Sequence, residues 1–434
     1  MAHIGIYGVS SQSGAAFLAD LVSEGALVYG YARPSDHGRQ VVEAIRQQGG
    51  VQVDRPEDVP DEKSHFVPLF GSEVGHDLER LADTCDLIFF THPSLYHEQT
   101  ARELAPLLQR RRRRVPIVLS PSRSLAAPYL WQILGEGYPI IAFQTCPYAC
   151  KCYRPGSVYI KRRKRAWVAS TEGRVAAESL LLLQAMFPGI VFSRTPAATS
   201  LGNIGAVFHP TAYLLNLPAI QLAAAQGRPY SFYMEGIANN PVVGAIVEEV
   251  DQIRLKIAQA VGCQVFGLRD NPREAEWQAI MARVERDALN ADPGLSAQER
   301  RRRRAELLRP IHDAVVSAQH WLAYTYGIER IPGESLASAI GRTPNFQSNS
   351  CPQQRYAEED VPTGLVPFEA LAQRFGIPCE PISRVIDLYS QLNQCDIRSS
   401  GRNLRDFSLE YLKDYLLGNL AHSRRERKWL ELVS

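Results

Sequence analysis

HIGIYGVSSQSGAAFLADLVSEG, residues 3–25, is the stretch that indicates the fold of the N-terminal part of the chain. Its apolar start is typical of a buried strand, and the rest has the period of an amphipathic helix that ends at Gly25. Short apolar runs then alternate with helical patterns, and the further strands that we expect are ALVYGYAR, DLIFFTHP, VPIVLSPS and YPIIAFQT. This alternation predicts a doubly wound parallel sheet in a Rossmann-like α/β domain.

The character of the chain changes at about residue 175. Beyond this point helical periodicity dominates and strand signals become sparse, as in AAESLLLLQAMF, GAIVEEVDQIRLKIAQAVG and PISRVIDLYSQLNQC. We therefore expect a dinucleotide-binding domain over residues 1–175, followed by a mainly α-helical substrate and catalytic domain over residues 176–434. The charged and polar residues 270–310 are interpreted as an inserted helical excursion.

The composition is that of an ordinary globular protein. Of 434 residues, 45% are hydrophobic and 22% charged, and the net charge of +2 gives no reason to expect a nucleic-acid partner or a membrane surface. No apolar run is long enough to span a membrane, and MAHIGIYGVSS lacks the features of a secretory signal. Eight cysteines are too few to indicate a disulfide scaffold, so a cytoplasmic location is expected.

Three arginine-rich runs, at 110–114, 161–165 and 300–304, interrupt this balanced composition. Each ends or flanks a predicted helix or strand, which favours a solvated face or charge at the end of a helix. The alternative, a nucleic-acid surface, would need aromatic partners and a net basic domain, and neither is evident.

The junction IYGVSSQSGAA has the position of a phosphate-binding turn between the first strand and the first helix. Dinucleotide folds place small residues there so that backbone N–H groups can approach a pyrophosphate. In the G-x-G-x-x-G pattern, Gly8 fills the first position, Ser10 the second, and Ser13 with Gly14 the third. We predict cofactor contacts from Gly8, Ser10, Ser11 and Ser13, although any tight strand–helix turn would have a similar composition.

Two arginines follow the second strand, in YGYARPSDHGR. Arg33 stands where an NAD enzyme normally carries an acidic residue for the ribose 2′-hydroxyl, and a basic residue there accommodates a 2′-phosphate. Arg39 could add a second positive charge. These positions favour NADPH over NADH, with NADH still possible. The alternative is that both are surface arginines on a loop.

FFTHPSLYHEQ follows a later strand, so Thr91 and Pro93 should lie at the carboxyl edge of the sheet, where such sheets bind ligands. We include both in the predicted cofactor site. His92 and His97 are poor evidence for a metal site because no carboxylate lies between them, and the spacing of CPYACKC is uncommon for zinc. No metal site is therefore predicted.

HPTAYLLNLP, residues 209–218, places one histidine in a mostly apolar run. His209 is either a core histidine bonded to a backbone carbonyl or a general acid/base that needs a partner. The best candidate partner lies in RYAEEDVPTGLVP, where Asp360 could orient the imidazole and Arg355 could bind a substrate carboxylate. The alternative for this segment is a plain solvated loop.

Several motifs together resemble those of the opine dehydrogenase family. They are TCPYACKCYRPGSV at 145–158, GNIGAVFHP at 202–210, FYMEGIANNPVVGAIVEEVDQIRLKIAQAVG at 232–262, RYAEEDVPTGLVP at 355–367 and GRNLRDF at 401–407. The resemblance covers most of the chain in the same order. It implies a nucleotide-binding domain joined to an all-helical domain, with the active site between them. It also implies an enzyme that reductively condenses an amino group with a 2-oxo acid.

The resemblance implies roles for individual residues. His209 matches the catalytic acid/base, with Asp360 as its partner, and Arg355 matches a ligand of a substrate carboxylate. Asn203 matches a substrate-site asparagine. The implied chemistry is hydride transfer from NADPH to the imine that the amine and the 2-oxo acid form. His209 takes up and returns the protons as a general acid/base.

Two further residues complete the predicted substrate site. Lys151 could bind the second substrate carboxylate, and Tyr148 could donate a hydrogen bond there, although a tyrosine in an apolar stretch is often a core residue. Both belong to the first of the motifs that carry the resemblance.

The length, the serine-rich turn and the insertion resemble the bacterial branch of the family that makes opine metallophores, such as staphylopine and pseudopaline. This branch implies an aminobutanoyl-histidine intermediate as the amine and pyruvate or 2-oxoglutarate as the oxo acid. The alternatives are an octopine- or nopaline-type enzyme acting on a simple amino acid, a 3-hydroxyacyl- or glycerol-phosphate-type dehydrogenase, and a sensor that binds NADPH without turnover. A homodimer is expected from the apolar faces of the helical domain.

Overall fold

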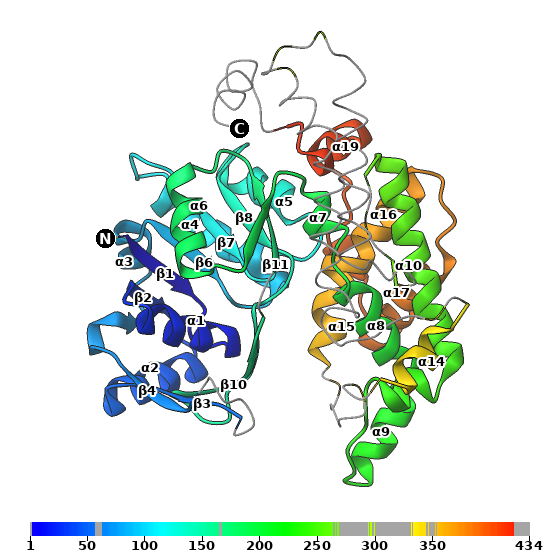
Figure 1. Cartoon of the computed structure of the whole chain (residues 1–434), viewed down its shortest axis with the longest axis horizontal. Helices are drawn as coiled ribbons and strands as arrows, with labels where there is room; N and C mark the ends of the chain where they lie inside the picture. The colour runs from blue at the N-terminus through cyan, green and yellow to red at the C-terminus, as the bar shows by residue number, and fades with distance from the viewer. Residues whose placement is uncertain are drawn as a thin grey trace. The chain divides into compact units, whose positions relative to one another are not determined.

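The computed structural model describes residues 2–56, 63–164, 167–263, 265, 267–268, 294, 296, 299, 331, 333–343, 346, 352 and 354–420. The chain divides into two compact units (Figure 1). The first comprises Met1–Ser122 and Ala126–Arg194, and the second comprises Arg123–Leu125 and Thr195–Ser434. The predicted insertion at 270–310 lies outside the described residues apart from 294, 296 and 299, and the arginine run at 300–304 lies wholly outside them.

The first unit is built on an eight-stranded sheet in the order β12-β11-β8-β7-β6-β1-β2-β5. Neighbouring strands are parallel except β8 and β11. The central strands are buried along nearly their whole length, as expected for the apolar runs of a parallel sheet. The strands are β1 (His3–Tyr7), β2 (Leu27–Tyr31), β5 (Val74–Gly75), β6 (Leu87–Phe90), β7 (Ile117–Leu119), β8 (Ile140–Phe143), β11 (Trp167–Glu172) and β12 (Ile190–Ser193). The predicted Rossmann-like sheet is confirmed.

Helices join successive strands of this sheet, as Figure 1 shows. They are α1 (Gln12–Ser23), α2 (Asp36–Gln48), α3 (Leu78–Thr84), α4 (His97–Leu108), α5 (Ala126–Leu134) and α6 (Ala177–Met186). Short 3₁₀ turns add Gly71–Glu73 and Ser94–Tyr96. Serine caps begin the first two helices, because the hydroxyl of Ser11 accepts from the Gly14 N–H and that of Ser35 accepts from the Gly38 N–H.

A second, four-stranded sheet packs against α1 and was not expected from the sequence. Its order is β4-β3-β10-β9, with β3 (Gly50–Asp54), β4 (His65–Pro68), β9 (Tyr148–Lys151) and β10 (Ser157–Arg163). The strands β3 and β10 pair in parallel although they are far apart in the chain. Local patterns carry no signal for such a distant pairing, which explains why the sequence did not reveal it.

The first unit ends later than the predicted boundary at residue 175. It includes α6 and β12 and extends to Arg194. The reason is that β12 pairs in parallel with β11 and so becomes the edge strand of the large sheet. A single helix and a short strand after residue 175 look like the beginning of a helical domain when only their periodicity is considered.

The second unit is helical in all the elements that the structure describes. Its helix α8 (Gly205–Leu215) packs against α10, α15 and α17. The other elements are α7 (Ala197–Ser200), α9 (Leu217–Ala225), η3 (Met234–Ala238), α10 (Pro241–Val261), α14 (Leu336–Gly341), α15 (Arg355–Asp360), η5 (Val361–Leu365), α16 (Val366–Arg374), α17 (Glu380–Asn393), α18 (Ile397–Ser400) and α19 (Leu409–Leu417). Both η3 and η5 are π-helical turns, a form often found at functional sites.

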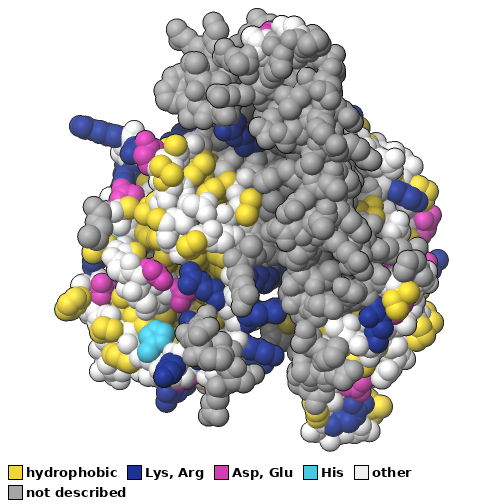
Figure 2. All heavy atoms as spheres, in the orientation of Figure 1, with side chains coloured by type: hydrophobic (Ala, Val, Ile, Leu, Met, Phe, Trp, Pro, Cys, Tyr) yellow, Lys and Arg dark blue, Asp and Glu magenta, His cyan; other side chains and the backbone are white. Residues whose placement is uncertain are grey.

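Charged side chains on the first unit take part in local contacts. Arg111 donates to the carbonyl oxygen of Ala82, and Arg113 pairs with Glu178, so these members of the 110–114 run lie just beyond α4 and serve the fold around it. On the face of this unit shown in Figure 2, basic and acidic side chains are interspersed with apolar ones. In the described ranges, none of the helices has the length and apolar composition needed to cross a bilayer.

Candidate active site

A histidine–aspartate pair lies within the second unit. The Nδ1 atom of His209, on α8, is 2.8 Å from Oδ2 of Asp360, the last residue of α15. Asp360 is fully buried, whereas the side chain of His209 keeps 24% of its surface exposed. A carboxylate that accepts from Nδ1–H leaves Nε2 of the imidazole as the proton acceptor. The two residues, 151 positions apart, thus form an oriented and partly accessible acid/base pair.

Arg123 contacts the acids beside the histidine and was not expected at the site from the sequence. Its Nη1 lies 3.0 Å from Oδ1 of Asp360, and its Nη2 lies 3.2 Å from Oε2 of Glu359. Arg123 has a φ of 60°, a left-handed conformation that is uncommon for residues other than glycine. The guanidinium therefore compensates the charge of a carboxylate that would otherwise be buried at high cost.

The segment that carries Arg123 is held by the second unit, although the sequence around it belongs to the first. The backbone N–H of Ser124 donates to the carbonyl oxygen of Thr363 at 3.0 Å, and Nη1 of Arg402 donates to that of Ser124 at 2.9 Å. The only sequence signal is SPSRSL at 120–125, a polar arginine-containing run directly after the strand β7. Such a run at the carboxyl end of a parallel strand marks a possible site but does not name its partner.

Aromatic rings cover the imidazole of His209. The ring of Tyr356 stacks on it with centroids 4.4 Å apart and planes 18° apart, and Phe232 meets it edge-on at 6.1 Å. The guanidinium of Arg355 lies 5.7 Å from the centroid of the Tyr356 ring. Arg355 is exposed and makes no ion pair with any residue in the described ranges. The predicted substrate arginine thus has no ion-pair partner among the described residues and lies one ring away from the imidazole.

Two glycines allow the close approach of these groups. A Cβ added to Gly205 would lie 2.6 Å from Nη1 of Arg123 and 3.3 Å from Nδ1 of His209. A Cβ added to Gly364, in η5, would clash with the Cβ of Ala206. Helices α8 and α15 with η5 can therefore bring the pair together only because side chains are missing at these two points.

Asn203 supports the segment that carries the arginine. The side chain is buried, its Nδ2 donates to Oγ of Ser124 at 3.2 Å, and its Oδ1 accepts from the N–H of Ala206 at 3.4 Å. The structure thus places this residue beside the pair, with its amide bonded to the protein at both ends. A substrate contact from Asn203 stays a prediction.

The phosphate turn in the first unit has the tight form that a dinucleotide requires. Gly8 has a φ of 96°, and its N–H donates to the carbonyl oxygen of Tyr31 at 2.9 Å. A Cβ on Gly14 would clash with the carbonyl oxygen of Gly8, so the chain returns on itself more closely than other residues permit. The turn leads directly into the 12-residue helix α1. These residues fit a cofactor pyrophosphate at the helix N-terminus.

Hydroxyl groups connect this turn to the loop after β6. Thr91 is buried and donates to the carbonyl oxygens of Tyr7 and Gly8 at 3.0 and 3.2 Å. In return, the hydroxyls of Ser11 and Ser13 donate to the carbonyl oxygen of Thr91 at 3.0 and 2.6 Å. The predicted residues on the two loops are thus bonded to one another, and Pro93 lies at the start of the 3₁₀ turn that follows.

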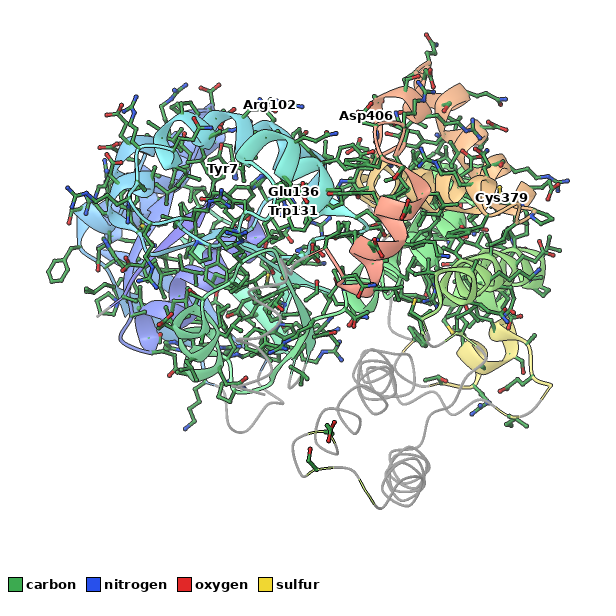
Figure 3. All side chains as sticks on the ribbon, turned by 90° about the horizontal axis from the view of Figure 1, so that it is seen from above. Tyr7, Arg102, Trp131, Glu136, Cys379 and Asp406 are labelled. Atoms are coloured by element: carbon green, nitrogen blue, oxygen red, sulfur yellow. The ribbon has the colours of Figure 1, made fainter. Side chains whose placement is uncertain are left out.

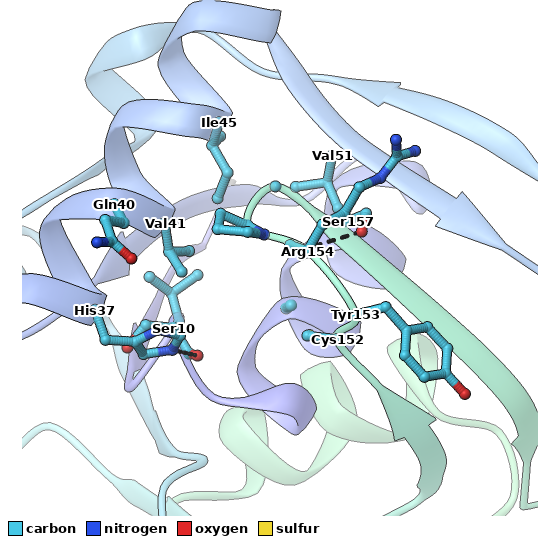
Figure 4. A pocket seen from close by; sticks show the side chains of 14 residues that line it. Ser10, His37, Gln40, Val41, Ile45, Val51, Cys152, Tyr153, Arg154 and Ser157 are labelled. Carbon is cyan, nitrogen blue, oxygen red and sulfur yellow. Dashed lines mark hydrogen bonds between the residues drawn. The ribbon is translucent and has the colours of Figure 1, made fainter.

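A cavity of about 250 Å³ opens beside the turn (Figure 4). Ser10 lines it, and the ring Nε2 of His37 lies 3.0 Å from the carbonyl oxygen of Ser10. Other lining residues come from α1, α2, β3 and residues 152–157. Because Gly8, Ser13 and Thr91 do not border it, the cavity lies beside the predicted phosphate site and does not coincide with it.

The two arginines after β2 differ in their surroundings. Arg33 donates through Nε to the Tyr7 hydroxyl at 2.7 Å and pairs through Nη2 with Glu103 at 2.8 Å. Arg39 is more exposed, pairs with Asp36 at 2.7 Å and donates to the carbonyl oxygen of Pro34. Both guanidiniums thus stay at the carboxyl end of β2, where a 2′-phosphate is expected.

The hydroxyl of Tyr148 is committed to the core of the first unit, which corrects its predicted substrate role. The side chain is buried, and its hydroxyl donates to Asp20 at 2.7 Å. Burial is the main cause that raises the pKa of Tyr148 well above its usual value, and the negative charge of Asp20 raises it further.

Lys151 is exposed at the end of β9 in the same unit. Cys150 of the same strand donates to the carbonyl oxygen of Gln12, and no metal-binding cluster occurs among the residues described.

A Rossmann-like unit followed by a helical unit with an oriented histidine–aspartate pair defines a dehydrogenase that uses a nicotinamide cofactor. Residues 193–277 and 296–393 match the family model described as NAD/NADP octopine/nopaline dehydrogenase, alpha-helical domain. The chain is 26% identical to an opine dehydrogenase of Arthrobacter sp. (strain 1C) over 404 residues, which cover 92% of this chain and 93% of the relative.

Solved structures agree in fold. An octopine dehydrogenase with NADH and L-arginine is similar with a TM-score of 0.62 and 17% identity, and the match covers 98% of this chain and 100% of that one. A yersinopine dehydrogenase is similar with a TM-score of 0.60 and 15% identity over 100% of this chain and 97% of that one. The chain is thus similar to opine dehydrogenases over most of its length, and it is an NAD(P)H-dependent oxidoreductase that acts on CH–NH bonds.

Proposed function

We propose that the protein reductively condenses the amino group of an amino acid with the carbonyl group of a 2-oxo acid, and that His209 is its general acid/base. The observation that carries this proposal is the 2.8 Å contact between Nδ1 of His209 and the buried carboxylate of Asp360. The pair stands in the part of the chain that matches the octopine/nopaline dehydrogenase model.

His209 moves the protons of the condensation. Its Nε2 takes a proton from the ammonium group of the amino acid, which frees the amine to attack the carbonyl group. The same atom returns a proton to the hydroxyl group that leaves as water. Asp360 holds the imidazole in one orientation throughout, and the ring of Tyr356 stacks on the face of the imidazole.

Two arginines near the pair, Arg123 and Arg355, have different proposed roles. Arg123 faces the buried carboxylates of Asp360 and Glu359 and is a positioning residue for the pair. Arg355, exposed and unpaired among the described residues, is the cation that binds a substrate carboxylate through two parallel hydrogen bonds. Asn203 and Lys151 complete the proposed substrate contacts.

The bound nicotinamide cofactor supplies the hydride. Gly8, Ser10, Ser11 and Ser13 of the turn hold its pyrophosphate together with Thr91 and Pro93. Arg33 and Arg39 hold the 2′-phosphate of NADPH. The tight turn at Gly8, which leads into α1, supports this assignment.

For the substrate pair we propose the metallophore branch, with an aminobutanoyl-histidine intermediate as the amine and pyruvate or 2-oxoglutarate as the oxo acid. The length of the chain and the serine-rich turn support this choice. An octopine-like reaction with a simple amino acid is the alternative. We also propose a homodimer in the cytoplasm, supported by apolar side chains such as Leu222 of α9, which stays 57% exposed.

The test is a screen of amine and 2-oxo acid pairs, with NADPH oxidation and the product mass as readouts. We expect oxidation only when both substrates are present. Oxidation with the oxo acid alone would indicate a hydroxy-acid dehydrogenase, and cofactor binding without oxidation by any pair would indicate a sensor.

A further inference from the structure

Arg33, Tyr7 and Glu103 form a closed triangle in the first unit. Nε of Arg33 donates to the Tyr7 hydroxyl at 2.7 Å, and this hydroxyl donates to Oε2 of Glu103 at 2.8 Å. Nη2 of Arg33 donates to Oε1 of Glu103 at 2.8 Å. Arg33, the residue predicted to bind the 2′-phosphate, is thus already paired with a carboxylate of the protein.

The three residues come from three different elements of the first unit. Tyr7 is the last residue of β1, Arg33 follows β2 by two positions, and Glu103 belongs to α4. Figure 3 shows Tyr7 within the first unit, whereas Arg102, the neighbour of Glu103, lies at the surface. The side chains of Arg33 and Glu103 keep 37% and 34% of their surface exposed, so a ligand can reach the pair.

We propose that Glu103 sets the choice between NADPH and NADH by sharing the guanidinium of Arg33 with the 2′-phosphate. The proposal rests on the cofactor site of the proposed function. Dinucleotide enzymes normally carry either a basic residue for the 2′-phosphate or an acidic residue for the 2′-hydroxyl. In this chain Arg33 and Glu103 place both kinds of residue at the same position.

Charge decides the direction of the effect. A guanidinium has five N–H donors, and Nη1 of Arg33 makes no hydrogen bond with any residue in the described ranges, so one edge is left for a phosphate. The Glu103 carboxylate contacts the other edge and repels a dianionic 2′-phosphate, which weakens NADPH binding. NADH lacks that phosphate, so its binding does not suffer from this repulsion.

Tyr7 keeps the carboxylate in place. Its hydroxyl accepts from Arg33 and donates to Glu103, so it fixes the two charged groups relative to each other. Burial is the main cause that raises the pKa of Tyr7 to about 12, so the hydroxyl keeps its proton at neutral pH. Tyr7→Phe therefore loosens the triangle without changing any charge.

The experiment is a titration of the purified protein with NADPH and with NADH, followed by cofactor fluorescence, without amine or oxo acid. We expect Glu103→Gln to tighten NADPH by about three- to tenfold and to leave NADH within about twofold. Added salt should reduce the difference between the variant and the original protein, because it screens the repulsion. Tyr7→Phe should shift NADPH in the same direction by a smaller factor.

Glu79→Gln is the matched control, because this exposed acid on α3 belongs to the same unit and does not contact Arg33. It should leave both cofactors unchanged. Weaker NADPH binding in Glu103→Gln would overturn the proposal, since it would mean that Glu103 holds Arg33 in its binding position. Equal shifts for the two cofactors would overturn it as well. The titration needs no turnover, so it fails independently of the proposed reaction.

Discussion

At the scale of single residues, the candidate active site is built around a buried carboxylate that has two partners. Oδ2 of Asp360 faces the imidazole of His209 and Oδ1 faces the guanidinium of Arg123. The chemistry of the residue types was sufficient to suggest His209 and Asp360 from the sequence. Arg123 could not be found in this way, because its left-handed backbone and its partner more than two hundred residues away leave no local pattern.

Replacing His209 should remove turnover. We expect His209→Ala to lower kcat by roughly 10²–10⁴-fold, the usual contribution of a general acid/base, in an assay of NADPH oxidation with both substrates. His65→Ala, which removes an exposed histidine of β4, is the control and should keep normal activity. Near-normal activity of His209→Ala would remove this residue from the mechanism.

Removing the arginine should destabilise the protein. Arg123→Met leaves the fully buried Asp360 facing an uncharged side chain, so we expect a loss of roughly 3–5 kcal/mol of unfolding free energy. Arg113→Met removes an exposed pair with Glu178 and should cost less than about 1 kcal/mol. Thermal melting compares the two variants. Equal melting temperatures would show that Arg123 does not compensate the buried charge.

At the scale of elements, the pair depends on how closely α8 approaches α15 and η5. The alternation of strands and helices was sufficient to predict the large sheet, because each apolar run is one buried strand. The small sheet and the 123–125 segment were not predictable in this way. Both depend on contacts between distant parts of the chain, which periodicity does not encode.

A methyl group between these elements should separate them. In Gly364→Ala the added Cβ would clash with that of Ala206, so we expect a loss of about 1–3 kcal/mol in stability and a fall in turnover. Gly341→Ala is the matched control in the same unit, because its Cβ would meet only ordinary contacts at 3.6 Å. Similar melting temperatures for the two variants would contradict the role given to Gly364.

At the scale of the whole molecule, the proposed cofactor site and the proposed proton-transfer pair belong to different compact units. The phosphate turn and Arg33 belong to the first, and the His209–Asp360 pair belongs to the second. The structure differs from the division that the sequence predicts in two ways. The first unit extends to Arg194, and residues 123–125 belong to the second unit. A pattern change at residue 175 marks the end of regular alternation, but it does not show which sheet a later strand joins.

This division predicts separable defects. Gly14→Val should abolish NADPH binding, because its side chain would displace the Gly8 carbonyl of the turn. His209→Ala should bind NADPH with an unchanged Kd while losing turnover. Fluorescence titration of both variants checks this, with thermal melting to show that each is folded. A large loss of NADPH affinity in His209→Ala would contradict the division.

The fate of the hydride is the decisive test of the proposed condensation. The protein would be incubated with an amino acid, a 2-oxo acid and NADPH that carries deuterium at the transferable position, and the product would be analysed by mass spectrometry. We expect one deuterium on the carbon that joins the former oxo acid to the new secondary amine, and no such product with His209→Ala. Deuterium in a 2-hydroxy acid, formed without the amine, would contradict it.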